Sequence, residues 1–142
     1  MNKLAAGVGA ETEATLLSSS PEQYMCPEQL AYFRRRLLAE EQELLSAVKA
    51  TAGHLQESQT SSDWNDRASA EEEHTLELRV RDRERKLLQK IRESIKRIDD
   101  GSYGWCEETG EPIGIARLLA RPTAALCLEA QERRELNKRR FG

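Results

Sequence analysis

Two segments of this chain, 30–55 and 76–98, repeat apolar residues at spacings of three, four and seven, with charged residues between them. That period places the apolar side chains along one face of an α-helix. Two such helices of similar length, joined by a short polar connection, are predicted to pack antiparallel as a coiled coil. The apolar positions are Leu30, Phe33, Leu37, Leu44, Ala47, Val48 and Leu55 in the first segment, and Val80, Leu87, Ile91, Ile95 and Ile98 in the second.

Start and stop signals set the limits of this hairpin at 27–100. Pro27 suits the first position of a helix, because its missing N–H would have no helical partner there. Gly101 follows two aspartates and is predicted to end the second helix as a C-cap.

The connection near 59–68 is polar and rich in turn formers, and a capping box of Ser69 and Glu72 is predicted to begin the second helix after it. Asp63 and Asp66 lie in this predicted tip, which is mostly acidic. An acidic tip is repelled by nucleic-acid phosphate and attracted to a basic cavity or a bound cation. Asp66 also has a structural explanation as a helix-start residue, and Asp63 as a solvated turn residue.

Composition favours an elongated all-α protein, since 38% of the 142 residues are apolar, 33% are charged and only 5% are aromatic. No apolar run approaches the roughly 20 residues that span a bilayer, and no secretory signal is evident, so we expect a cytoplasmic protein without a membrane partner. The net charge of -3 argues against direct sequence-specific DNA binding, which depends on clustered basic residues.

The two ends of the chain differ from the hairpin. We expect residues 1–26 to be a mostly disordered leader, part of which packs on the base as a helical turn. Glycine and proline are concentrated over 101–114, and a short helix at 115–120 and a C-terminal helix are predicted to follow. We therefore expect 101–142 to form a small globular base. Its predicted core is Tyr103, Trp105, Ile113, Ile115, Leu118, Leu119 and Leu126.

This base carries half of a zinc-binding pattern. Cys106-x-x-Thr109 and, after 17 further residues, Cys127-x-x-Ala130 have the spacing of a four-cysteine zinc module. Threonine offers a neutral hydroxyl and alanine no donor, so we predict a degenerate zinc finger without tightly bound zinc. The two cysteines are then explained as small buried apolar residues or as a redox pair. With Cys26 the chain has three cysteines, and this odd number makes a disulfide framework improbable.

Three stretches, Asp63-x-x-Asp66-Arg67-Ala68, 76–87 and 113–124, together resemble the DksA family of bacterial transcription factors. The resemblance extends from about residue 24 to about residue 130. It implies a non-catalytic protein that inserts its coiled coil into the secondary channel of RNA polymerase, with the tip near the active site. It also implies that open promoter complexes are destabilised together with the alarmone ppGpp.

The resemblance assigns roles to residues that composition alone would leave as a helix-forming alanine and surface charges. The matched positions are Asp63, Asp66 and Ala68 at the tip, and Leu87, Lys90 and Arg121 at an interface with ppGpp and polymerase. Arg92, Lys96 and Arg97 are candidates for further positive potential nearby.

Two departures from the family pattern matter. The halved ligand set at Cys106, Thr109, Cys127 and Ala130 makes the chain similar to the zinc-independent members. Gln131 stands where the family usually has a lysine facing the alarmone, which weakens the expectation of ppGpp synergy.

Two other function classes compete with this one. A cysteine-based redox or metal sensor would use Cys106 and Cys127, and it predicts folding that depends on zinc or oxidant. An enzyme is not predicted, because no nucleophile and base, phosphate-binding loop or catalytic carboxylate pair is recognisable. We expect a monomer whose partners are RNA polymerase and ppGpp.

Overall fold

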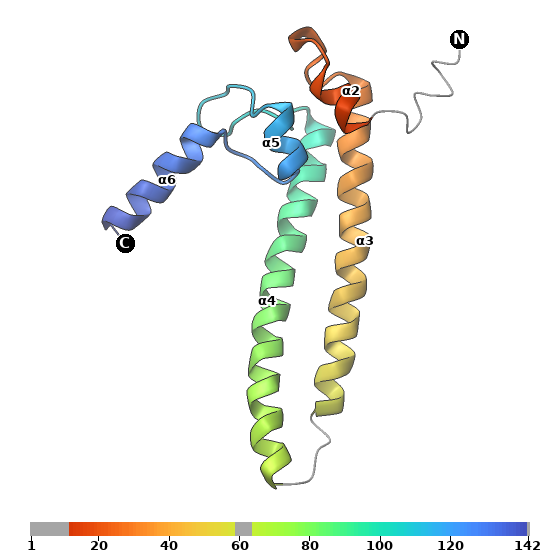
Figure 1. The fold of residues 1–142 in the computed structure, drawn as a ribbon, viewed down its shortest axis with the longest axis vertical. Helices are drawn as coiled ribbons and strands as arrows, with labels where there is room; N and C mark the ends of the chain where they lie inside the picture. Colours follow the sequence, from red (N-terminus) through yellow and green to blue (C-terminus); the bar gives the residue numbers. More distant parts are fainter. Residues whose placement is uncertain (1–11, 59–63, 142) are drawn as a thin grey trace, which may run out of the picture. The chain divides into compact units, whose positions relative to one another are not determined.

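The computed structural model describes residues 12–58 and 64–141, with side chains described for 12–50 and 69–140. The expected all-α fold with a long helical hairpin is confirmed, and Figure 1 labels its elements. No strand occurs within the described ranges, where Trp105 and Pro112 form an isolated antiparallel bridge. The elements are α2 (Glu13–Leu17), the 3-10 helix η1 (Pro21–Gln23), α3 (Pro27–Ser58), α4 (Trp64–Asp100), α5 (Ile115–Ala120) and α6 (Leu128–Phe141).

The chain divides into two compact units. Residues 1–38 and 93–142 form the base unit, and residues 39–92 form the arm unit, so that α3 and α4 contribute to both. No helix in the described parts of the chain is long and apolar enough to cross a membrane.

Most of the predicted helix limits are confirmed, but the start of α4 is not. The capping box placed the start at Ser69, whereas the helix begins five residues earlier, at Trp64. The Ser-x-x-Glu pattern also fits inside a helix, and adding Ala68 and Arg67, both good helix formers, costs little once the helix is nucleated. Half of the predicted tip at 59–68 is therefore the first part of α4.

In the arm unit, the apolar seam of α4 lies in a different phase from the one predicted. Val80 and Leu87 are 45% and 44% exposed, although both were expected in the seam. Ile91, which is 1% exposed, sets the phase, and counting back from it by three or four residues gives positions that are only partly exposed. These positions are Glu77, Arg81, Glu84 and Leu88. The less exposed face of α4 in the arm unit is thus largely polar. A pattern of apolar residues could not indicate such a face.

The base unit is built around aromatic and aliphatic side chains from its separate elements. Phe33 of α3 is fully buried and its ring lies 5.6 Å from that of Tyr103, which is 1% exposed. The Tyr103 hydroxyl donates a 2.7 Å hydrogen bond to the Pro122 carbonyl. Leu37 and Leu118 are also fully buried.

Four of the predicted core residues of the base, Ile113, Leu118, Leu119 and Leu126, are buried with Tyr103, whereas Ile115 is half-buried and Trp105 is 38% exposed. The expectation of a buried Trp105 was wrong. Successive residues of extended backbone point in opposite directions, and here the neighbouring Cys106 is the buried one.

The leader is more ordered than expected over its second half. Glu13–Leu17 form α2, whose Leu16 is fully buried, and α2 contacts α5. The Thr12 hydroxyl caps this helix by accepting the Thr15 N–H at 3.2 Å. A five-residue helix is too short to show a period in sequence. The first 11 residues lie outside the described part.

Tyr24 and Met25 attach the leader to the glycine-rich loop of the base. The Tyr24 hydroxyl donates to the Gly104 carbonyl at 2.6 Å and accepts the Gly114 N–H at 2.9 Å. The Tyr24 ring meets Trp105 edge-on, with centroids 5.3 Å apart. These contacts join residues about 80 positions apart in sequence.

Gly104→Ala is expected to destabilise the base more than Gly110→Ala. Both glycines have positive φ, +91° and +76°, so alanine strains the backbone at either position by about 1–2 kcal/mol. A Cβ at Gly104 would also lie 2.7 Å from the Met25 sulfur, whereas a Cβ at Gly110 would meet nothing within 4 Å. Urea unfolding should therefore give the lower midpoint for Gly104→Ala. Equal midpoints would show that Met25 does not pack closely over this loop.

Candidate functional site

The predicted tip determinants fall mostly outside what the structure describes. Asp63 lies outside the described residues, and Asp66 and Ala68 belong to the first two turns of α4, where only the backbone is described. Their roles therefore stay predictions. The next part of α4 that carries described side chains is acidic and exposed at 71–73.

Leu87 and Lys90 lie on an exposed face of α4 in the arm unit. Arg83 lies one turn before Leu87 and is also exposed, so an aliphatic side chain lies between two basic ones at helical spacing. Arg121 directly follows α5 in the base unit and is exposed as well. All three predicted interface residues are thus accessible within their own units.

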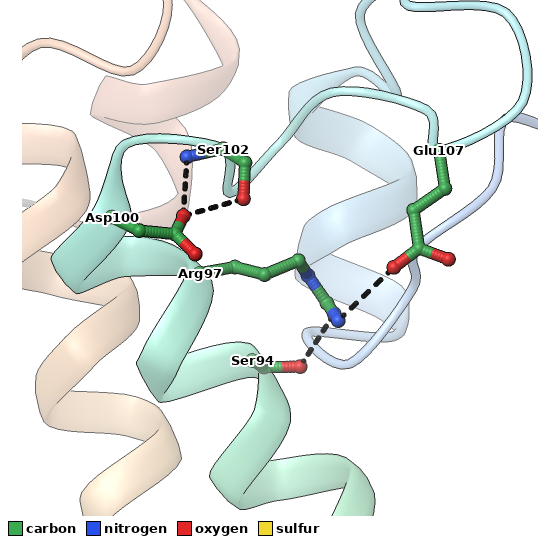
Figure 2. A network of polar contacts seen from close by, with 5 residues as sticks. All are labelled: Ser94, Arg97, Asp100, Ser102 and Glu107. Atoms are coloured by element: carbon green, nitrogen blue, oxygen red, sulfur yellow. Dashed lines mark hydrogen bonds and ion pairs between the residues drawn. The ribbon is translucent and has the colours of Figure 1, made fainter.

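Arg97 has a structural task in the base unit. Its guanidinium donates to the Ser94 hydroxyl at 2.9 Å and lies 3.5 Å from a Glu107 carboxylate oxygen (Figure 2). The Arg97 carbonyl accepts the N–H groups of Ser102 and Tyr103. The side chain is only 14% exposed, so this residue holds the end of α4 to the next loop and contributes little free positive charge.

Asp100 supports the same junction. Its carboxylate accepts the Ser102 hydroxyl at 2.6 Å and the Ser102 N–H at 3.0 Å (Figure 2). These two hydrogen bonds, the hydroxyl first, lower the pKa of Asp100. The loop that carries the half zinc pattern therefore leaves α4 through a fixed turn, closed by Gly101 at a φ of +87°.

Three of the four degenerate metal positions meet at one place. The Thr109 hydroxyl lies 4.0 Å from the Cys127 sulfur, and it is also one of the groups that lower the pKa of Cys106. Cys106 is buried, and Cys127 is half-buried immediately before α6. Ala130, the fourth position, is fully buried in the first turn of α6.

The backbone around Cys106 favours a thiolate. Burial raises the pKa of this thiol, but hydrogen bonds from the Thr109 hydroxyl and from the N–H groups of Cys127, Thr109 and Glu108 outweigh it and lower the pKa to about 6. An inert buried cysteine, the simplest explanation from sequence, would have a raised pKa. These N–H donors cannot be recognised in the sequence, because they depend on the fold of the loop.

Stability should consequently rise with pH above about 6 in the wild type, up to the pKa of an ordinary thiol near 8.5. Over that range the unfolded chain binds a proton at Cys106 that the folded chain does not, so raising the pH favours the folded state. Urea unfolding in reducing buffer between pH 6 and 8.5 should show this rise in the wild type and lose it in Cys106→Ala. Parallel pH profiles for the two proteins would contradict the lowered pKa.

Comparisons with known proteins cover most of the chain. Residues 29–98 match the family model described as DnaK suppressor protein DksA, N-terminal domain, and residues 101–136 match the prokaryotic dksA/traR C4-type zinc finger. The chain belongs to the DksA family. This confirms the resemblance seen in the sequence.

Individual DksA relatives agree. The chain is 53% identical over 122 residues to a protein of Caulobacter vibrioides, covering 85% of this chain and 86% of that one, and 47% identical over 121 residues to one of Escherichia coli K12, covering 84% and 80%. Both are named RNA polymerase-binding transcription factor DksA. The solved structure of transcription factor DksA2 from Pseudomonas aeruginosa matches with a TM-score of 0.83 and 47% identity, over 90% of this chain and 99% of that one.

The residues present do not fit the zinc ion that the DksA zinc-finger model implies. A structural zinc site takes a full tetrahedral set of cysteine or histidine ligands. Here the pattern offers two sulfurs and the neutral hydroxyl of Thr109, and its fourth position is the fully buried Ala130, which has no donor atom in its side chain. No group of three or more histidine, cysteine or acidic side chains that could hold a metal ion occurs among the described residues.

Sequence reasoning missed the polar contacts that hold this base together. Arg117, whose role the sequence left open, donates through Nε to the Leu126 carbonyl at 3.0 Å. Glu108 pairs with Arg134 of α6 at 2.6 Å. Tyr24 and Arg97 add the contacts described above, so the leader and the end of α4 both hold the loop that carries Cys106.

Proposed function

We propose that this protein is a transcription regulator that binds RNA polymerase through its secondary channel and destabilises open promoter complexes. The observation that carries the proposal is the family match over 29–98 and 101–136, with relatives at 53% and 47% identity that are named RNA polymerase-binding factors. The long hairpin and its exposed Leu87 and Lys90 are compatible with insertion into a channel. In this proposal the tip acts near the polymerase active site, and the protein itself is not an enzyme.

We further propose that the protein acts without zinc and together with ppGpp in the cytoplasm. The support for zinc independence is the donor set, with Thr109 and Ala130 in place of two cysteines. The base has an apolar core of its own, which includes Tyr103, Phe33 and Leu118, and it needs no metal to form that core.

Transcription in vitro from a ribosomal RNA promoter tests this function. Full-length protein treated with a chelator should still inhibit transcription, and ppGpp should strengthen the inhibition. Metal analysis of the same sample should find no stoichiometric zinc. A protein that leaves polymerase output unchanged with and without ppGpp would overturn the function, and inhibition that disappears on chelation would overturn zinc independence.

Lys90→Ala and Arg121→Ala should each weaken the ppGpp-dependent part of the inhibition. A hydrogen bond to a charged group contributes about 1.5–3 kcal/mol, so the ppGpp concentration for half-maximal effect should rise by about 10-fold or more. Lys86→Ala is the matched control, because Lys86 is 73% exposed, lies one turn from Lys90 and pairs with Asp82 at 3.2 Å. An equal loss in the control would argue against a specific alarmone contact.

A further inference from the structure

Arg121, which the proposed function places at the ppGpp interface, is positioned by its backbone alone. Its side chain is exposed and makes no hydrogen bond or ion pair within the described part of the chain. As the C-cap of α5, Arg121 donates its N–H to the Arg117 carbonyl at 2.8 Å, and its carbonyl accepts the Ala124 N–H at 3.0 Å. The contacts that fix α5 therefore also fix the point from which this guanidinium extends.

The helix α5 depends on contacts with the rest of the base unit. A helix of six residues forms too few hydrogen bonds to offset the cost of its first turn, so packing has to stabilise it. Leu118 and Leu119 are buried, and Arg117 donates to the Leu126 carbonyl. Further contacts come from the leader.

The leader, residues 12–26, contacts α5 directly and also holds its N-cap. The Tyr24 hydroxyl accepts the N–H of Gly114, which is the N-cap of α5, at 2.9 Å. The same hydroxyl donates to the Gly104 carbonyl at 2.6 Å. The helix α2 contacts α5, and its Leu16 is fully buried. The leader thus supports this short helix at two places.

The leader is itself anchored to α3, so it can serve as a support. Gln29 of α3 is 2% exposed, and its side-chain oxygen accepts the Met25 N–H at 2.8 Å. Its side-chain nitrogen donates to the Ser19 hydroxyl at 2.9 Å, and that hydroxyl donates to the Leu16 carbonyl at 2.6 Å. One buried amide therefore links α3 to the end of α2 and to the segment that follows Tyr24.

We infer that Tyr24 and Leu16 are positioning residues for the alarmone interface, and that through α5 they set where Arg121 meets ppGpp. The inference rests on the proposed function, which gives Arg121 its role. A guanidinium binds a phosphate with two parallel hydrogen bonds only when its direction is fixed beforehand. Loosening the leader should therefore weaken the response to ppGpp and leave the arm unit, residues 39–92, unchanged.

Hydrogen exchange followed by mass spectrometry tests the positioning of α5 without reference to transcription. Tyr24→Phe keeps the ring and removes two hydrogen bonds, so the amides of 115–121 in the full-length protein should exchange about 10-fold faster. Tyr32→Phe is the matched control, because the Tyr32 hydroxyl has no hydrogen-bond partner among the described residues of the same unit. Unchanged exchange in Tyr24→Phe, or equal acceleration in the control, would overturn the inference.

The ppGpp dependence of inhibition tests the step from α5 to Arg121. Tyr24→Phe should raise the ppGpp concentration for half-maximal effect by about 3- to 10-fold, no more than loss of Arg121 itself, while inhibition without ppGpp stays at the wild-type level. Added to Arg121→Ala, Tyr24→Phe should have no further effect, because one residue acts through the other. An additive double variant, or equal losses with and without ppGpp, would show that Tyr24 only supports the fold.

A second pair of variants keeps the test independent of the Tyr24 side chain. Leu16→Ala removes a fully buried side chain of α2, whereas Leu17→Ala removes one that is 57% exposed. Only Leu16→Ala should speed exchange over 115–121 and weaken the response to ppGpp, and equal effects of the two would contradict the inference.

The wild type supplies two further outcomes. Leader amides that exchange freely while those of α5 stay protected would show that the leader does not hold α5. A wild type without any ppGpp-dependent inhibition would overturn the proposed function, and the exchange rates would still decide whether the leader holds α5.

Discussion

Leu37→Ala is expected to lower the free energy of unfolding by about 2–5 kcal/mol, while Leu38→Ala at the next position should lower it by less than about 1 kcal/mol. Leu37 is fully buried in the base unit and Leu38 is 39% exposed. The two variants remove the same atoms from the same helix, so helix propensity changes equally in both. Urea unfolding followed by circular dichroism measures the difference.

The outcome bears on how a base without a full metal site stays folded. If apolar packing is the main source of its stability, a chelator should leave both unfolding curves unchanged. Similar midpoints for Leu37→Ala and Leu38→Ala would mean that this end of α3 is not packed as described. A wild-type midpoint that falls on chelation would mean that a metal ion, and not the core, closes the base.

Local signals predicted the limits of most helices because the chemistry of a helix end depends on neighbouring residues. Pro27 starts α3, and Gly101 follows the end of α4 with positive φ, as expected. The short helix at 115–120 was also predicted correctly. The start of α4 was missed because a serine three residues before a glutamate is equally compatible with a helix interior.

Contacts between residues far apart in the sequence could not be predicted from the pattern of residue types. The buried face of α4 could not be identified from the sequence, because Val80 and Leu87 continue an apolar repeat as well as Leu88 and Ile91 do. The attachment of Tyr24 to the loop near Gly104 depends on a tyrosine hydroxyl that meets two backbone groups only after folding.

The candidate metal positions were predicted as a set from their spacing, and the structure brings Cys106, Thr109 and Cys127 together. Spacing carried this information because the zinc-finger pattern specifies which residues converge. The state of the cysteines was not predictable in the same way. Whether a buried thiol is inert or a thiolate is decided by the N–H groups that point at it, and these belong to the backbone of the folded loop.

Asp66→Asn should abolish most of the effect on transcription while leaving helix content unchanged. Asparagine keeps the size and the ability to accept a hydrogen bond but removes the charge, and α4 begins at Trp64, so Asp66 lies in its first turn. The favourable interaction of a carboxylate with a helix N-terminus contributes only about 0.3–1 kcal/mol, too little to unfold a helix of 37 residues. If instead the carboxylate contacts polymerase, its loss should raise the protein concentration for half-maximal inhibition by about 10-fold or more.

Glu71→Gln provides the matched control, because it removes one exposed negative charge from the same helix outside the predicted tip. The effect of Asp66→Asn is specific if Glu71→Gln inhibits transcription as the wild type does. If Asp66→Asn loses helix content, and loses inhibition only in proportion to that loss, Asp66 has a role in helix capping. Full inhibition by Asp66→Asn combined with Asp63→Asn would contradict a tip that acts through its carboxylates, because the hairpin would then act on polymerase by its shape alone.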